Sequence, residues 1–280
     1  MRAAPSRGFT LIELIVVMVI LAVSGIAVFS FIGIGTQIFV DSVGRDQLAG
    51  QSRFAVERIT REVRDAVPAS LRVATDNTSY TCLEFVPAVA SGLYLQIPRP
   101  NADIPMQVVT PLENLAVGQR VLVNGLTAPQ IYANSGAARS RIIASVATNT
   151  PAVGLSQLDI DGAFVSASPA QRFYVLEDAV SWCLEGFAPP RNIVRYSDYG
   201  REPNGDASQP NPATMAALGA GEIMAQGLTN YLAALNEEPF AVQAASLQRF
   251  GLVQLDWRFT RLEAPEPLVL YHEIQVWNVQ

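Results

Sequence analysis

The sequence has no lysine, one histidine (His272) and only two cysteines (Cys82 and Cys183) among its 280 residues. So few soft ligands exclude a Cys/His zinc cluster of the usual kind. Every basic residue is an arginine, the formal net charge is −6, and no block of basic residues occurs. This charge balance argues against a dedicated nucleic-acid binder, and we expect no nucleic-acid partner.

Charge is also missing from one long stretch near the start of the chain. No charged residue lies between Glu13 and Asp41. Apolar residues fill about 20 positions from Leu14 to Ile34, the length that an α-helix needs to cross a bilayer. The sequence therefore predicts one membrane-inserted helix, followed by enough chain for one sizeable globular domain.

The segment before the apolar stretch is short and basic. It contains Arg2 and Arg7 and ends at Gly8, so the small residue precedes the apolar run instead of following it as in an ordinary secretory signal. This order favours removal of a leader on the cytoplasmic side, with the apolar run retained. The two arginines favour a cytoplasmic N-terminus.

Glu13 is the anomaly of this region. A carboxylate within a membrane helix costs roughly 2.5–3.5 kcal/mol on insertion scales, and such residues are functional by default. The alternative is that Glu13 lies in the headgroup region, where the cost is small.

The residues Gly8-Phe9-Thr10-Leu11-Ile12-Glu13 resemble the cleavage and methylation motif of type IV prepilins and type II secretion pseudopilins. The resemblance implies that a prepilin peptidase/methyltransferase cuts between Gly8 and Phe9 and methylates the new Phe9 amine. It also implies that Glu13 neutralises the N-terminal amine of a neighbouring subunit. Physical chemistry agrees, because two ions that have both lost their water shell must be paired.

The helical pattern continues beyond the membrane segment. Leu48, Ala55, Ile59, Val63 and Val67 recur at helical spacing and predict one apolar stripe. Pro68 ends the helix because it disfavours helix at the residue before it. Three opposite-charge pairs lie four residues apart: Glu57/Arg61, Arg58/Glu62 and Arg61/Asp65. We predict a leader at 1–8, a transmembrane and assembly helix at 9–40, its amphipathic continuation at 41–67, and a β-rich head domain at 68–280.

Arginines recur in the second half of this helix, and a DNA-binding face is one interpretation of them. Acidic residues interleave with them, which favours a solvated or filament-packing face. The residues are Arg45, Arg53, Arg58, Arg61, Arg64 and Arg72, interleaved with Asp41, Asp46, Glu57, Glu62 and Asp65.

After Pro68 the patterns become those of strands and turns. Two hairpins are expected, one joining 172–176 to 180–184 and one joining 252–261 to 269–279. The predicted fold class is α+β, with a long N-terminal helix packed on an antiparallel β-sheet domain. The predicted strands are Thr81–Val86, Gly92–Ile97, Arg120–Val123, Arg141–Ala147, Arg172–Leu176, Val180–Leu184, Leu252–Arg261 and Val269–Val279.

Two further segments of the head have distinctive composition. Residues 198–212 have the composition of a long loop, and such loops are often functional, so this one is a candidate interaction surface. Residues 213–235 are alanine-rich and predict a short helix.

Cys82 and Cys183 both lie in predicted strands. A periplasmic destination permits disulfides, and a Cys82–Cys183 bridge is the economical interpretation. Two buried free thiols are the alternative.

Residues able to support catalysis are sparse. His272 stands alone in a strand; a Ser/His/Asp grouping remains open, but a structural histidine is the better interpretation. Asp159-Ile-Asp161-Gly162 is a weak calcium-loop fragment without the downstream glutamate, and a β-turn explains it better. We expect no enzyme, no catalytic residue, no cofactor and no metal.

The segments Gln47–Pro68, Cys82–Pro87 and Val180–Cys183 resemble MshO-type minor pilins of the MSHA pilus system. They also resemble J-type pseudopilins and PilW-type minor pilins. The resemblance implies a subunit that primes or caps assembly of a surface pilus. Its partners would be other major and minor pilins, an inner-membrane assembly platform and the inner membrane, with the head domain periplasmic and later in a filament.

Two alternatives to the pilus role stay open. One is a minor pseudopilin of a type II secretion system, which uses the same helix physics. The other is a pilus-tip adhesin that binds a glycan or surface through the exposed domain.

Overall fold

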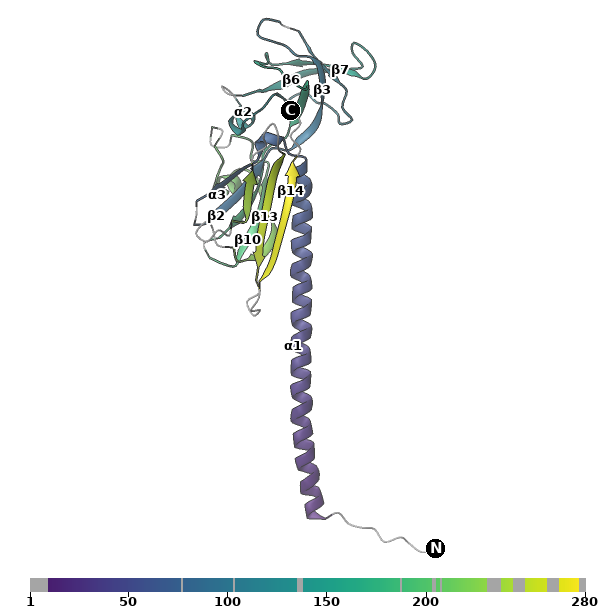
Figure 1. The fold of residues 1–280 in the computed structure, drawn as a ribbon, viewed down its shortest axis with the longest axis vertical. Coiled ribbons are helices and arrows are strands. Elements are labelled where there is room, and N and C mark those ends of the chain that lie inside the picture. Colours follow the sequence, from purple (N-terminus) through teal and green to yellow (C-terminus); the bar gives the residue numbers. More distant parts are fainter. Residues whose placement is uncertain are drawn as a thin grey trace, which may run out of the picture. The chain divides into compact units, whose positions relative to one another are not determined.

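The computed structural model of the protein is shown in Figure 1. It divides into two compact units, Met1–Gly50 and Gln51–Gln280, and the helix α1 (Leu11–Arg64) runs through both. The structure describes residues 10–76, 78–102, 104–134, 138–186, 188–202, 205–206, 208–230, 238–243, 250–260 and 267–276.

The long helix is confirmed, with slightly shorter bounds than the predicted 9–67. Thr10 lies just before the first turn, where the Glu13 backbone N–H donates to the Thr10 carbonyl (3.1 Å) and side-chain oxygen (3.4 Å). The helix ends at Arg64, and a 3₁₀ turn, η1 (Pro68–Ser70), follows. Val67 has ψ 126°, the extended conformation that a following proline imposes.

The part of α1 that belongs to the second unit buries one face against a sheet. Ala55, Ile59 and Val63 are fully buried in a cluster with Leu83 and Trp182, among other sheet residues. The predicted apolar stripe is therefore confirmed at these three positions. Helix and sheet form the two layers of an α+β domain.

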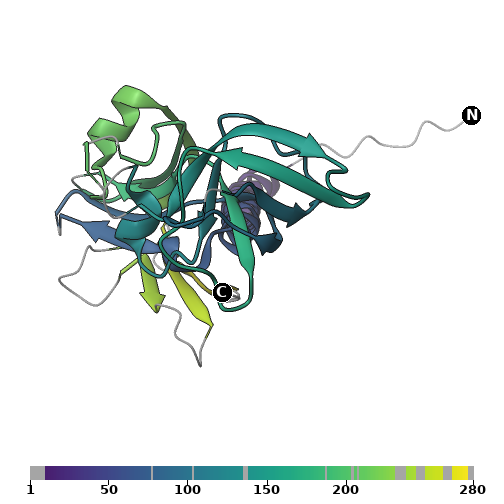
Figure 2. The ribbon, with the colours of Figure 1, turned by 90° about the horizontal axis from the view of Figure 1, so that it is seen from above.

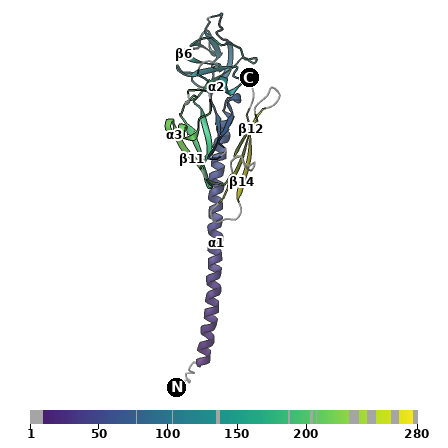
Figure 3. The ribbon, with the colours of Figure 1, turned by 90° about the vertical axis from the view of Figure 1, so that its left-hand side faces the viewer.

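The sheet is antiparallel throughout and is assembled from both ends of the head sequence. The strand order is β1-β2-β9-β10-β11-β13-β12, and β14 pairs with β13. Figure 3 shows β11 with the short helix α3 (Pro212–Leu218) apart from β12 and β14. The strands are β1 (Arg72–Thr75), β2 (Tyr80–Phe85), β9 (Val180–Glu185), β10 (Arg191–Ser197), β11 (Ala220–Leu228), β12 (Phe240–Gln243), β13 (Gly251–Phe259) and β14 (Leu268–Val276).

The chain between β2 and β9 forms a closed six-stranded barrel, with strand order β3-β4-β7-β6-β5-β8. Its interior is a separate hydrophobic cluster that includes Tyr94, Met106, Leu158 and Phe173. Figure 2 shows these teal strands grouped as one body. The elements are β3 (Ala88–Gln96), β4 (Met106–Val109), β5 (Arg120–Val123), α2 (Ala128–Tyr132), β6 (Ser140–Thr148), β7 (Leu155–Ile160) and β8 (Arg172–Leu176).

The predicted hairpin of 172–176 with 180–184 is wrong. β8 pairs with β3 and β5 inside the barrel, whereas β9 pairs with β2 and β10 in the sheet. Each strand already has two neighbours, so none of its edges is left for the other. The short connection at 177–179 is the point where the chain leaves the barrel for the sheet.

The second predicted hairpin is confirmed. β13 and β14 pair along their length, with Val253 opposite Ile274. Trp257, Phe259, Ile274 and Val276, which alternate with polar residues along the two strands, are buried. Residues 261–266, which connect the strands, and 277–279 lie outside the described residues.

The single helix predicted for 213–235 is only partly correct. α3 ends at Leu218 and the chain then enters β11. At Gly219 an added Cβ would lie 2.0 Å from the Ser197 carbonyl oxygen, so only glycine allows the chain to turn this closely against β10. The last part of the predicted helix, 231–235, lies outside the described residues.

A disulfide joins Cys82 to Cys183, which confirms the sequence-based pairing. The two cysteines face each other directly in the β2–β9 register and are fully buried. Their cluster also contains Leu122 and Tyr132 from the inserted segment. The bridge therefore closes the chain around the whole barrel insertion.

Replacing both cysteines with alanine should lower the free energy of unfolding by about 2–4 kcal/mol, because a loop of this length loses much of its entropy when it is closed. Urea unfolding of the oxidised protein and of the double variant measures this. The single change Cys82→Ala should give one alkylatable thiol. Equal unfolding midpoints for the double variant and the parent would contradict the prediction.

Candidate functional site

The N-terminal motif is described only from Thr10 onward. Gly8 and Phe9, the predicted processing residues, lie outside the described residues. Glu13 lies in the first turn of α1, and an acidic side chain there is favourable because the helix N-terminus carries partial positive charge. Within the described part of the chain the Glu13 carboxylate has no ion-pair partner.

The rest of this segment exposes apolar side chains on every side. Leu14, Val19, Phe29 and Phe31 are each more than half exposed in the isolated chain. This helix is long and apolar enough to cross a membrane. A helix that is apolar all round must be covered by lipid or by other helices. Together with the motif, it fits membrane anchoring of a C-terminal globular domain.

A group of charged and aromatic side chains links the second half of α1 to the sheet, and sequence reasoning identified it only in part. We call Glu62, Arg58, Arg195 and Trp182 the helix clamp. The Glu62 carboxylate accepts from Arg58 Nε (2.5 Å), Arg195 Nε (3.0 Å) and Trp182 Nε1 (2.9 Å). Arg58/Glu62 confirms one predicted pair, whereas Glu57/Arg61 and Arg61/Asp65 lie beyond ion-pair distance.

Three members of the clamp, Glu62, Arg195 and Trp182, are largely withdrawn from water, whereas the Arg58 side chain is 41% exposed. The Glu62 and Arg195 side chains are only 15% and 13% exposed. Charge-assisted hydrogen bonds in such a place are among the stronger polar contacts. The register of α1 on the sheet is therefore held by polar contacts as well as by the apolar stripe.

His272 contributes a further contact between helix and sheet. Its Nε2 lies 3.1 Å from Thr60 Oγ1. The structure thus places the lone histidine against a helix hydroxyl, which is its hydrogen-bond partner among the described residues. A structural role explains this geometry.

The Asp159–Gly162 fragment also has a structural explanation. Asp159 accepts from the Ser145 hydroxyl (2.6 Å), and Asp161 accepts from the Ile142 backbone N–H (2.6 Å). Both carboxylates thus fasten β6 to β7. Among the described residues, no group of three potential metal ligands occurs.

A buried polar network lies beside the disulfide, and no sequence pattern indicated it. Glu84 is fully buried and accepts from Arg72 Nε (2.5 Å) and the Tyr199 hydroxyl (2.7 Å), while Tyr199 also contacts Ser181. Burial raises the pKa of the Glu84 carboxyl, although Arg72 and Tyr199 act against this. The Arg72 guanidinium stacks over the Tyr132 ring at 3.5 Å. Arg72 is therefore an internal ion-pair partner, not part of a DNA-binding face.

The predicted 198–212 loop is anchored at several described points. Tyr199 is buried, Arg201 donates to the Ile131 carbonyl and to Asn134, and Gln209 donates to the Cys82 carbonyl. Burial lowers the pKa of Arg201 to about 10. Residues 203, 204 and 207 lie outside the described residues. The segment is thus attached to the sheet at Tyr199 and Gln209 and to the inserted segment at Arg201, whereas residues 205, 206 and 208 are exposed.

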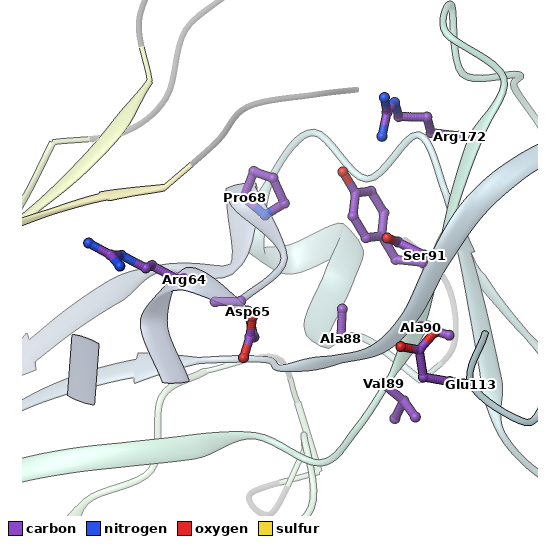
Figure 4. Close-up of a pocket in the computed structure, with 11 residues that line it drawn as sticks. Arg64, Asp65, Pro68, Ala88, Val89, Ala90, Ser91, Glu113 and Arg172 are labelled. Atoms are coloured by element: carbon purple, nitrogen blue, oxygen red, sulfur yellow. The ribbon is translucent and has the colours of Figure 1, made fainter. Parts of the chain in front are cut away.

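A cleft of about 450 Å³ lies where the end of α1 meets the barrel. Figure 4 shows Arg64, Asp65 and Pro68 on one side, and Ser91, Glu113 and Arg172 on the other. Among its described lining residues, two side chains of each sign occur, and they form no ion pair with one another. Its described lining residues include no histidine and no cysteine.

Comparison with known proteins identifies the start of the chain. The prokaryotic N-terminal methylation motif matches residues 4–29. No curated protein and no solved structure matches the chain. The motif supports a type IV pilin-like or pseudopilin subunit, a class that is generally structural, and it implies processing by a prepilin peptidase and assembly with other pilins.

The change Glu62→Gln should lower the free energy of unfolding by about 1.5–3 kcal/mol, because it removes the charge that two guanidiniums and an indole share. Urea unfolding in detergent micelles, followed by tryptophan fluorescence, measures this. Glu57→Gln is the matched control, since Glu57 lies on the same helix, is exposed and forms no ion pair with any residue that the structure describes. An equal decrease in the free energy of unfolding in both variants would show that the helix clamp does not stabilise the fold.

Proposed function

We propose that the chain is a minor type IV pilin of the MSHA type, which primes or caps assembly of a surface pilus through its N-terminal helix. The observation that carries the assembly role is α1: its first half is apolar on every side and has Glu13 in its first turn, inside the matched methylation motif. Such a surface suits a subunit that lies first in lipid and then among the helices of other subunits.

The proposal assigns each segment a role. The leader 1–8 is removed by cleavage between Gly8 and Phe9, and the Phe9 amine is methylated. Residues 9–40 anchor the subunit in the inner membrane, and 41–67 continue the helix into the periplasmic head at 68–280. The partners are the prepilin peptidase/methyltransferase, the assembly platform, and other pilins.

The barrel insertion favours a minor subunit over a major one. The strands from β3 to β8 add a second body to a head that the sheet and helix already complete. Because every copy in a shaft must pack against its neighbours, a large insertion suits a subunit present in few copies. Placement at or near the end of the filament is the simplest arrangement for it.

In the filament, Glu13 is proposed to pair with the methylated amine of a neighbouring subunit. Its carboxylate has no ion-pair partner within the described part of its own chain, so a partner from outside is needed once water is removed. The same pairing would operate in a type II pseudopilus. The helix alone thus does not separate the two systems.

The change Glu13→Val should leave leader cleavage intact and reduce incorporation into filaments about tenfold or more, because the neighbouring amine loses its counter-charge. Immunoblots of sheared filaments and of the membrane fraction measure incorporation and cleavage together. Glu57→Val is the control on the same helix and should incorporate normally. Normal incorporation of Glu13→Val would refute the assembly role.

The function itself is tested in a strain that lacks the gene. Sheared pili and secreted proteins are quantified in the same cultures, with the gene restored as the control. Loss of pili with normal secretion is the expected result. Retained pili with secreted proteins trapped in the periplasm would overturn the pilus assignment in favour of a type II pseudopilin.

A further inference from the structure

The sheet has a second face, opposite the helix. Leu83 and Trp182 point into the helix cluster, whereas their strand neighbours Cys82 and Cys183 point into a separate cluster. The second face is covered there by the inserted segment and by Met215 of α3. The inserted segment and α3 do not cover this face at the end of the strands where Tyr80 and Glu185 lie.

An open cavity of about 740 Å³ lies at that end, within the size range of small-molecule sites. Its floor is one row of three side chains, because Tyr80 pairs with Glu185 and Glu185 pairs with Asn192 across β2, β9 and β10. One wall is Asn211, near the end of the 198–212 segment that the sequence marks as a candidate interaction surface.

The floor and wall present an aromatic ring, a carboxylate and two amides. Glu185 accepts from the Tyr196 hydroxyl through Oε2 (3.0 Å), and its Oε1 has no hydrogen-bond partner within the part of the chain that the structure describes. The Asn192 amide has no partner among the described residues. Asn211 uses its oxygen to accept from the Thr214 N–H (2.9 Å), which leaves its amide N–H groups as donors.

The charge of the cavity excludes anions. Its described lining contains two carboxylates, Asp76 and Glu185, and no arginine. Both Asp76 oxygens already accept hydrogen bonds within the β1–β2 turn, from Thr78, Ser79 and Tyr80. Burial raises the pKa of the Glu185 carboxyl, although the Tyr196 hydroxyl acts against this, so the pocket does not favour added charge there. Because both Asp76 oxygens are already used and the Glu185 carboxyl resists added charge, the lining selects for hydrogen-bonding groups, and hydroxyl groups complement its remaining acceptor and amide donors.

We propose that this cavity binds a neutral saccharide. The Tyr80 ring supplies a flat apolar surface for the C–H face of a sugar. Glu185, Asn192 and Asn211 supply the acceptors and donors that sugar hydroxyls need. The inference goes beyond the proposed assembly role and does not depend on it.

The test uses the full chain, purified in detergent micelles, on an array of neutral oligosaccharides of hexoses and N-acetylhexosamines beside sialylated and sulfated ones. Titration calorimetry with the best neutral oligosaccharide then gives the affinity. Asn192→Ala and Tyr80→Ala should each weaken binding about fivefold or more. Gln275→Ala, which removes an exposed strand amide from β14, should leave it unchanged.

Selective binding of neutral glycans, lost in both cavity variants and kept in the control, supports the proposal. Asn192→Ala is the decisive variant if Tyr80→Ala fails to fold. Three results would overturn the proposal: no neutral glycan bound, preference for acidic glycans, or full affinity in Asn192→Ala. Because binding is measured without filaments, a failure here leaves the assembly role untouched, and a failure to assemble leaves this test intact.

Discussion

The architecture of this protein depends on one constraint: the first unit, Met1–Gly50, leaves the apolar surface of its helix uncovered. The side chains of α1 from Leu14 to Val40 are exposed on all sides of the helix. In water, each fully exposed large side chain of this kind forgoes roughly 1.5–3 kcal/mol of burial free energy. The helix is stable only in lipid or among other apolar helices, so membrane residence and assembly follow from one physical requirement.

The second half of the same helix meets the opposite condition. Its apolar face is narrow, and the sheet covers it at Ala55, Ile59 and Val63. The helix clamp then adds specificity, because Glu62 can accept hydrogen bonds from both Arg195 and Trp182 in only one register of the helix on the sheet. The apolar contacts hold α1 against the sheet, and the hydrogen bonds of the helix clamp set the register in which the helix packs.

The barrel insertion is joined to the sheet by more than its two connecting segments. The cluster around the disulfide contains residues from the sheet, from the inserted segment and from α3. Glu84, Arg72 and Tyr132 extend this contact with buried polar groups. The two strands that the disulfide joins also pack against the helix on their other face.

The sequence by itself determined the long helix, the motif with Glu13, the α+β class, the β13–β14 hairpin and the Cys82–Cys183 pairing. These depend on local patterns: an uncharged run, periodicity, and the presence of only two cysteines. The closed barrel, the separation of β8 from β9, the conversion of the alanine-rich segment into β11, and the partners of Glu62 and Glu84 were decided by the tertiary structure. Strand pairing and buried ion pairs join residues far apart in the chain, and their energies depend on which edges and charges the rest of the fold leaves available. No short window of sequence contains that information.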